Sequence, residues 1–504
     1  MLENQSFDRM FAMSGIPGII AATTRDSNSH DDTAYHVQNG APVVMPTDPG
    51  HEFLDVVEQL GGEGAVYPPG GPYPAINNSG FAANYATSTT EGPASPPQDI
   101  GDIMACFGTQ SQLPVFYQLA TQFALCDQWF SSLPGPTWPN RYFVHGASSS
   151  GLDDSPSLVQ MGTWEIDGFP FPHGSIFQAL DDASIQYRLY SDFNPSPGSS
   201  YGLSLFGDDV QNGSLAGAIP QASSLQGVSL MDFHSLLHFA SDLQGPYPYT
   251  YTFIEPHYGD IVRGSYTGGS SQHPVDDMAG GQKLVQAVYE AIRNSPYWNS
   301  SLLIITFDEH GGFYDSVAPG TATAPGDHPG DGFNAYGFTF EQYGVRVPTI
   351  VVSPLIAAGT VDHTVYDHAS VLATLERLFG LKALTQRDAA ASDVTHLFTQ
   401  AEPRGDCPAK LSSPAPLLEA ARRPLPAEEL AEIDQQPLPA SGNLPGLLSI
   451  LLKTEIELSS RTPAAIAGLV AKVKGIKTRG EARAYIASVM DKVRAARAAS
   501  VRTH

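Results

Sequence analysis

The stretch Asp308-Glu309-His310-Gly311-Gly312-Phe313-Tyr314 follows an apolar run, residues 301–307 (SLLIITF), and the two together predict the fold. The run lacks alternating polar residues, which is typical of a strand covered on both faces in a parallel sheet. Ligands of open α/β sheets bind beyond the carboxyl ends of the strands, where these carboxylates and the imidazole stand. Hard cations prefer carboxylate oxygens, and glycines allow a sharp turn. The stretch therefore predicts an acidic, metal-binding catalytic edge, with an ordinary turn as the alternative.

Strands and helices alternate along the rest of the first 400 residues. Runs of β-type residues at 185–190, 249–254 and 347–352 also end in polar residues. Apolar side chains recur at helical spacing over 276–294 and again over 367–379. A strand–helix–strand succession predicts a mostly parallel central sheet flanked by helices, hence an α/β fold.

Composition limits the classes of function. The 504 residues carry 26 Lys+Arg against 52 Asp+Glu, a net charge of −26, which argues against a nucleic-acid surface. A bound cation would still allow an anionic substrate. Cys106, Cys126 and Cys407 form no CxxC pair, so a structural zinc cluster is not expected and buried free thiols are favoured. No run reaches transmembrane length, and residues 1–8 do not resemble a signal peptide, which leaves localisation unknown.

Three regions are expected. Residues 1–400 form one catalytic domain, residues 401–446 a Pro-rich linker, and residues 447–504 an Ala-rich helical tail with a basic end. The favoured interpretation of this tail is a solvated helical pair packed on the main domain. The alternative is peripheral contact with an anionic membrane or an acidic partner.

Four further segments carry groups suited to chemistry. Glu3 and Asn4 offer two oxygen ligands for a cation. Thr137 lies on a loop where a helix can start, so it is either a nucleophile activated by a metal or an N-cap. Arg141 is suited to bracing a phosphoryl oxygen or to an ordinary ion pair. Polar groups including Glu255 follow another strand, and His273 precedes the helix expected at 276–294, where the helix dipole favours anions. His51 lies in a loop, and we expect its side chain to lie at the surface.

In order, these segments resemble a known family. The chain contains ENQSFD (3–8), PGPTWPNR (134–141), IQYRLY (185–190), TFIEPHYGD (252–260), HPVDD (273–277), TFDEHGGFYD (306–315), GVRVPTIVVSP (344–354) and YDHAS (366–370). On this set, the chain is identified as a member of the bacterial phosphoesterase family of phosphocholine-type phospholipases C and AcpA-type acid phosphatases. The resemblance runs from Leu2 to about Leu381. It implies an alkaline-phosphatase-like α/β sandwich, here followed by a C-terminal helical extension.

The resemblance also implies roles for individual residues. Thr137 matches the nucleophile, which would form a phosphothreonine, and His273 matches a histidine near the leaving group. His51 matches a second active-site histidine, and His234 lies in the region where a further histidine is expected. A divalent cation (Ca²⁺, Mg²⁺, Mn²⁺ or Zn²⁺) is implied, with ligands at Glu3, Asn4, Asp308, Glu309 and the Thr137 oxygen. Three more residues lie inside matched motifs without a fixed role: Arg141, Glu255 and His310.

Several alternatives stay open at this stage. The substrate is a phosphoester, and both a phospholipase C-like diesterase and an acid phosphatase-like monoesterase fit the motifs. Aromatic residues in the loops suit either cation–π binding of a choline head group or ordinary packing. They are Tyr67, Tyr73, Phe81, Tyr85, Tyr201 and Tyr336. Family members carry a strand immediately before ENxSFD, and no such strand precedes Leu2 in this sequence. A non-catalytic binding protein on a decayed phosphoesterase fold is therefore the rival class.

Overall fold

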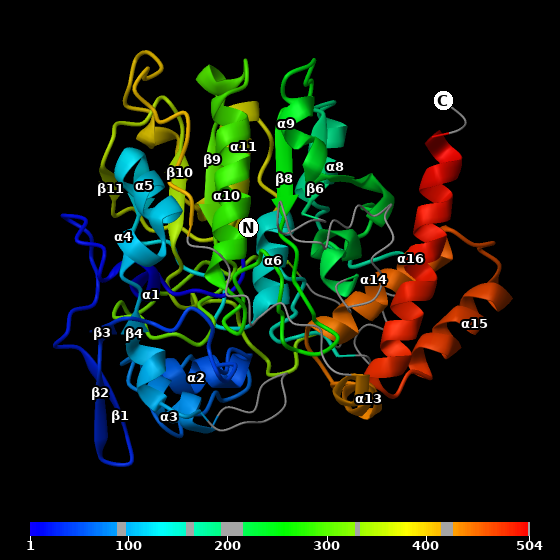
Figure 1. Cartoon of the computed structure of the whole chain (residues 1–504), viewed down its shortest axis with the longest axis horizontal. Helices are drawn as coiled ribbons and strands as arrows, with labels where there is room; N and C mark the ends of the chain where they lie inside the picture. The colour runs from blue at the N-terminus through cyan, green and yellow to red at the C-terminus, as the bar shows by residue number, and fades with distance from the viewer. Residues whose placement is uncertain (88–96, 158–165, 193–214, 328–332, 415–426, 502–504) are drawn as a thin grey trace.

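The computed structural model is a mixed α/β protein with a group of helices at the C-terminal end (Figure 1). The expected fold class, with its helical extension, is confirmed. The structure describes residues 1–87, 97–157, 166–192, 215–327, 333–414 and 427–501.

Two sheets form the centre of the main domain. One has the order β11-β5-β10-β9, in which β11 is parallel to β5 while β10 is antiparallel to both of its neighbours. The other has the order β7-β6-β8 and is entirely parallel. The strands are β5 (Ala124–Cys126), β6 (Tyr187–Ser191), β7 (Phe233–Ser235), β8 (Tyr251–Glu255), β9 (Leu303–Thr306), β10 (Thr349–Val352) and β11 (Thr360–Asp362).

The first two residues lie between these sheets. The Leu2 N–H donates to the Thr306 carbonyl at 2.9 Å, and the Asp308 N–H donates to the Leu2 carbonyl at 3.1 Å. The Met1 ammonium donates to the Ile254 carbonyl at the end of β8, at 3.5 Å. An apolar cavity of about 470 Å³ extends from these residues between β8 and β9, toward helices α10 and α11. Met1 and Leu2 line this cavity, and Leu2 forms a parallel bridge with Phe307.

Two of the predicted helices have the expected positions. Helix α10 (Met278–Arg293) begins where the Asp277 side chain accepts the Ala279 N–H at 2.7 Å. Helix α11 (Ala369–Phe379) ends at Gly380, which has a φ of 69°. Glycine adopts this left-handed conformation without strain because it has no Cβ. The shorter elements before α10 are α1 (Phe7–Phe11), β1 (Ser27–His30), β2 (Thr33–His36), β3 (Gln38–Asn39), α2 (Phe53–Gly61), α3 (Phe81–Thr87), β4 (Ala105–Cys106), α4 (Thr109–Gln112), α5 (Pro114–Gln122), α6 (Thr137–Gly146), α8 (Ile176–Asp182) and α9 (Phe239–Asp242).

The C-terminal helices share a core with the main domain. After α12 (Gln386–Ala390), they are α13 (Ala427–Gln435), α14 (Asn443–Glu457), α15 (Pro463–Lys474) and α16 (Arg479–Val501). Apolar side chains of α14 and α16 join one cluster with Trp138, Tyr142 and Phe253 of the main domain. Helix α14 begins inside the stretch expected to be a linker and is buried along most of its length. The boundaries at 400 and 447 stay predictions.

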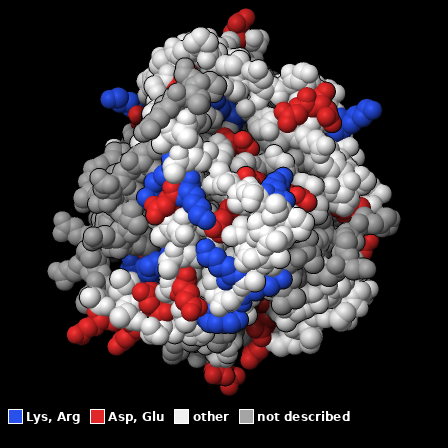
Figure 2. All heavy atoms as spheres, turned by 90° about the vertical axis from the view of Figure 1, so that its right-hand side faces the viewer, with Lys and Arg blue, Asp and Glu red and all other residues white. Residues whose placement is uncertain are grey.

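Cations and carboxylates are mixed on the C-terminal face (Figure 2). Lys472 and Lys492 both pair with Glu455, and Arg483 pairs with Asp434. These pairs neutralise part of the basic end, and membrane contact there stays a prediction. Among the helices that the structure describes, none combines the length and apolar character needed to cross a bilayer.

The aromatic residues of the predicted loops belong to packed clusters. Phe81 and Tyr85 are buried in one core, and Tyr67 lies edge-on to Phe53 in another. These residues therefore pack as anchors; Tyr201 lies outside the described residues. Cys106, Cys126 and Cys407 are buried free thiols, as expected.

Gly446 tests how tightly α14 packs on the main domain. A Cβ at this position would lie 2.2 Å from the Trp138 ring, so we expect Gly446→Ala to lower the free energy of unfolding by about 1–3 kcal/mol through overpacking. Urea denaturation measures the change. The control is Gly468→Ala in α15, where nothing lies within 4 Å and the better helix propensity should stabilise by up to about 1 kcal/mol. Equal effects in the two variants would contradict this packing.

Candidate active site

The N-terminal segment passes between two loops at the strand ends. The Glu3 N–H donates to the Ser271 carbonyl at 2.8 Å, and the Gln5 N–H donates to the Glu309 carbonyl at 3.1 Å. Asn4 between them has a φ of 53°, a left-handed conformation that Asn tolerates better than most residues. These bonds bring the 3–5 segment beside both the 271–273 loop and the acidic stretch after β9.

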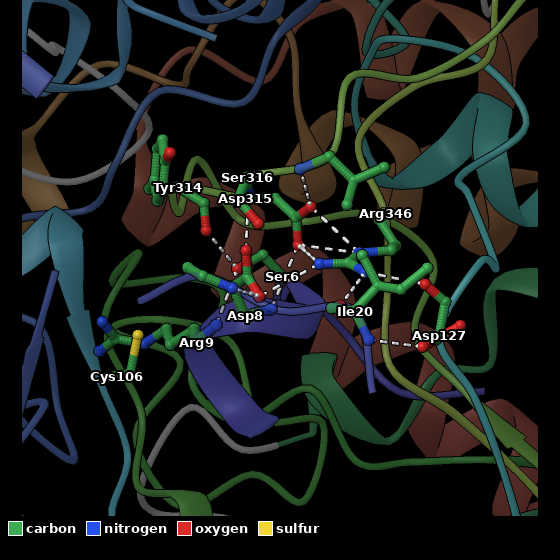
Figure 3. A network of polar contacts seen from close by, with 12 residues as sticks. Ser6, Asp8, Arg9, Ile20, Cys106, Asp127, Tyr314, Asp315, Ser316 and Arg346 are labelled. Carbon is green, nitrogen blue, oxygen red and sulfur yellow. Dashed lines mark hydrogen bonds and ion pairs between the residues drawn. The ribbon is translucent and has the colours of Figure 1, made fainter. Parts of the chain in front are cut away.

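A buried ion network fixes the helix that follows this segment (Figure 3). The Arg346 guanidinium contacts Asp8 of α1 and Asp315, each at 3.1 Å, and also donates to the Asp127 carbonyl at 2.8 Å. Asp8 in turn accepts the N–H groups of Ala22 and Ser316. Burial raises the pKa of Asp315 to about 7, and Arg346 opposes that rise. The network holds α1, and with it the 3–5 segment, against the strand ends.

Asn4 connects the residues expected to hold a metal. Its Nδ2 donates to Thr137 Oγ1 at 3.1 Å and to Glu309 Oε1, and its backbone N–H donates to Asp308 Oδ1 at 3.3 Å. Asn4 is fully buried, and its Oδ1 has no hydrogen-bond partner among the described residues. The structure thus brings Asn4, Thr137, Asp308 and Glu309 together.

Thr137 is the first residue of α6. The N-cap is Pro136, so the interpretation of Thr137 as the N-cap is wrong. Pro139 follows within the first turn, where a missing N–H costs no helical hydrogen bond. The unpaired N–H groups and the dipole of a ten-residue helix favour an anion beside its first turn.

Arg141, one turn along α6, joins two acidic segments. It contacts Asp308 Oδ2 at 3.2 Å and Glu255 Oε2 at 3.5 Å, with all three side chains buried. Glu255 also accepts the backbone N–H groups of Gln221 and Ala222 at 2.9 and 2.8 Å, so it braces a loop. Arg141 and Glu255 therefore lie at the site as an ion pair.

Burial sets the protonation of the acidic pair after β9. It raises the pKa of Asp308, although the nearby Arg141 charge lowers it. It also raises the pKa of Glu309 to about 8; the charge of His51 opposes this rise and that of Asp308 adds to it. One guanidinium does not balance these buried carboxylates, so the site favours an additional positive charge.

The histidines lie on the other side of the acidic pair. His273 Nε2 is 3.8 Å from Asp48 Oδ2, and its ring stacks on Tyr266 with centroids 3.5 Å apart. The His51 ring meets the His273 ring edge-on at 5.9 Å, and both side chains are buried, so the surface expectation for His51 is wrong. Burial lowers the pKa of His273 well below its ordinary value, which keeps the ring neutral.

His310 supports the acidic pair. Its Nδ1 lies 3.2 Å from Glu309 Oε2, and its Nε2 lies 2.7 Å from Gln59 Oε1. Burial lowers its pKa to about 3. A neutral ring held between two partners can orient Glu309.

Sequence reasoning missed several residues at this site. His368 Nε2 lies 2.6 Å from the Asp308 carbonyl, and the motif YDHAS was the available signal for it. Asp48 and Tyr266 flank His273 without any motif that singled them out. His234, in contrast, lies on β7, where its Nδ1 is 3.1 Å from a guanidinium nitrogen of Arg188. Gln59, which contacts His310, was also missed, as was Asn443, whose Nδ2 donates to Glu3 Oε1 at 3.5 Å.

No group of three or more His, Cys, Asp or Glu with metal-binding geometry occurs among the described residues. A cation here would depend on the amide oxygen of Asn4 and the hydroxyl of Thr137 as well as on carboxylates. The metal centre stays a prediction.

Removing Arg346 should destabilise the protein strongly. We expect Arg346→Met to cost about 3–5 kcal/mol in the free energy of unfolding, because Asp8 and Asp315 stay buried without their cation. Chemical denaturation followed by tryptophan fluorescence measures the cost. Arg461→Met is the control, since its pair with Asp167 is more than half exposed and should contribute less than about 1 kcal/mol. A small effect at Arg346 would contradict the clamp.

Comparisons with known proteins place this site in context. The family model described as "Phosphoesterase family" matches residues 1–382. Non-specific phospholipase C4 of Arabidopsis thaliana is 35% identical over 440 residues, covering 82% of this chain and 73% of that protein. Phospholipase C B of Mycobacterium tuberculosis is 28% identical over 443 residues, covering 82% and 79%. The relatives thus include plant as well as bacterial proteins.

Among solved structures, the phosphonate monoester hydrolase of Agrobacterium radiobacter aligns with a TM-score of 0.32 and 12% identity, covering 59% of this chain and 74% of that one. A similarity this low carries no argument about function.

Proposed function

Because this chain belongs to the Phosphoesterase family and is a phosphoric ester hydrolase, we propose that it is phospholipase C-like and uses Thr137 as its nucleophile. The observation that carries the proposal is the Asn4 side chain, which contacts both Thr137 Oγ1 and Glu309. A hydroxyl at a helix start beside buried carboxylates is the arrangement that a metal-assisted nucleophile requires.

The residues present fit a divalent cation. Asn4 Oδ1 is a buried oxygen without a hydrogen-bond partner among the described residues, and the carboxylates of Asp308 and Glu309 exceed the positive charge of Arg141. The ligands would be Glu3, Asn4, Asp308, Glu309 and the Thr137 oxygen. All-oxygen sets suit Ca²⁺, Mg²⁺ or Mn²⁺, while the nearby histidines also suit Zn²⁺. When bound, the cation would lower the pKa of the hydroxyl and screen the charge of the phosphate.

The protein's own groups then divide the work. Thr137 Oγ1 attacks phosphorus, and the bond from phosphorus to the leaving oxygen breaks. The neutral His273 ring takes up, by way of solvent, the proton that Thr137 releases and passes it to the leaving oxygen, so that the ring ends neutral. Asp48 and the stacked Tyr266 orient the His273 ring for this transfer. Water then attacks the phosphothreonine, the bond from phosphorus to Thr137 Oγ1 breaks, and a proton of that water restores the Thr137 hydroxyl. The first turn of α6 favours the anionic phosphoryl group throughout.

The relatives' names favour a phospholipid-type diester over a monoester. An acid phosphatase-like monoesterase keeps the same nucleophile and differs only in what occupies the leaving-group side. Turnover of p-nitrophenylphosphorylcholine against p-nitrophenyl phosphate separates the two. Absence of turnover on both esters, with divalent cations supplied, would favour the rival non-catalytic binding protein.

Replacement of Thr137 gives the direct test of the nucleophile. We expect Thr137→Ala to lower kcat at least about 1,000-fold, because the attacking oxygen is lost. Thr137→Ser keeps the hydroxyl and should retain turnover within about tenfold of the unmodified protein. Release of p-nitrophenol from both esters is the measurement. Wild-type turnover in Thr137→Ala would end the nucleophile assignment.

Metal removal gives a second test. Dialysis against EDTA should abolish turnover, and titration with separate divalent cations should restore it, since a buried acidic cluster needs the positive charge. Metal content is measured by atomic emission before and after dialysis. Full turnover in protein shown to be metal-free would contradict metal dependence.

A further inference from the structure

The amide of Asn443 joins the C-terminal helices to the candidate active site. Asn443 is the first residue of α14, follows the N-cap Gly442, and is 5% exposed. One turn further on, Gly446 lies directly under the Trp138 ring, where a side chain would not fit. The start of α14 is therefore seated against the start of α6 (Figure 1).

All four hydrogen-bonding positions of this amide are used. Oδ1 accepts from Trp138 Nε1 at 2.7 Å and from Gln221 Nε2 at 3.1 Å. Nδ2 donates to the Tyr266 hydroxyl at 2.8 Å and to Glu3 Oε1 at 3.5 Å. Because an indole N–H can only donate, Trp138 fixes which way the amide faces. The NH₂ group must then point at Glu3 and Tyr266.

Three of the four partners lead directly to residues of the proposed mechanism. Glu3 is a proposed cation ligand, and Trp138 follows the proposed nucleophile Thr137 in α6. Tyr266 lies flat against the His273 ring, with an interplanar angle of 1°. Asn443 thus contacts the proposed ligand Glu3 itself, the residue that follows Thr137, and the tyrosine that stacks on His273. It does so from a helix in which the sequence predicted no site residue.

We propose that Asn443 is a positioning residue for phosphoester hydrolysis, through which the C-terminal helices complete the active site. This inference rests on the proposed function for the roles of Glu3 and His273. Hydrogen bonds behind a metal ligand orient it, and their loss typically lowers metal affinity or activity 10–100-fold. The donor side of the amide, toward Glu3 and Tyr266, carries this role. The acceptor side seats Trp138.

Two substitutions separate the two sides of the amide. Asn443→Asp keeps the acceptors for Trp138 and Gln221 but removes both donors, with almost no change in shape. Asn443→Leu removes all four bonds. Thr454→Val is the matched control on α14, since the Thr454 hydroxyl is buried and donates to the Ile450 carbonyl within the helix.

The full-length variants are compared by kcat and KM on p-nitrophenylphosphorylcholine, by Tm, and by Mn²⁺ binding in isothermal titration calorimetry. We expect kcat to fall 10–100-fold in both Asn443 variants, with KM within threefold and Mn²⁺ affinity reduced about tenfold in Asn443→Leu. Thr454→Val should keep kcat within twofold and should lower Tm as much as Asn443→Asp does.

Wild-type kcat and Mn²⁺ affinity in Asn443→Asp would overturn the inference, since the donors would then have no role beyond packing. The same holds if kcat falls in Thr454→Val as much as in Asn443→Asp. Failure of the proposed function is a separate outcome, because it would be seen as an active Thr137→Ala protein. The measurement of Mn²⁺ affinity tests the positioning role of Asn443 independently of turnover.

Discussion

Arg346 is the cation on which the arrangement of the candidate site depends. It is fully buried between Asp8 and Asp315. Asp8 ends the segment that contains Glu3 and Asn4, and Asp315 ends the segment that contains Asp308 and Glu309. An N-terminal stretch with little regular structure loses much conformational entropy when it is fixed. The ion network, together with the backbone bonds at Leu2, Glu3 and Gln5, provides the compensating interactions. Asn4 is then held where it contacts both Thr137 and Glu309.

The balance of buried charges constrains the site as much as the positions of its residues do. The buried carboxylates of Asp308 and Glu255 both contact the guanidinium of Arg141, and Glu309 is buried directly after Asp308. Burial raises the pKa of Asp308 and Glu309, so their negative charges are costly unless more positive charge is present. This imbalance is the physical basis for proposing a cation there. The neutral, buried rings of His273 and His310 do not supply that charge.

The C-terminal helices pack beside the site, because α14 and α16 bury their apolar side chains in the same core as Trp138. A helix that packs on the main domain only through apolar contacts would need no side-chain hydrogen bonds to that domain at its first residue. Asn443 makes four, and they reach three different parts of the site. The proposed function and the role proposed for Asn443 can therefore be tested on one set of variants.

Local signals in the sequence predicted much of this protein. Runs of β-type residues predicted strands β6, β8, β9 and β10. Every residue of β10 is buried, which its continuous apolar pattern indicates. The periodic residues of α10 and α11 predicted both helices. The motifs also predicted that Asn4, Thr137, Asp308 and Glu309 belong to one site, and the structure brings them together.

Only the tertiary structure decided what no short stretch encodes. Asp48 contacts His273, and His368 supports the Asp308 loop; the two residues of each pair are far apart in sequence and meet only when the core forms. The antiparallel direction of β10 likewise depends on how its neighbours pack. The sequence by itself determined the α/β class, the family and the groups able to do chemistry. Packing decided their protonation and the link through Asn443, because burial and long-range hydrogen bonds exist only in the folded chain.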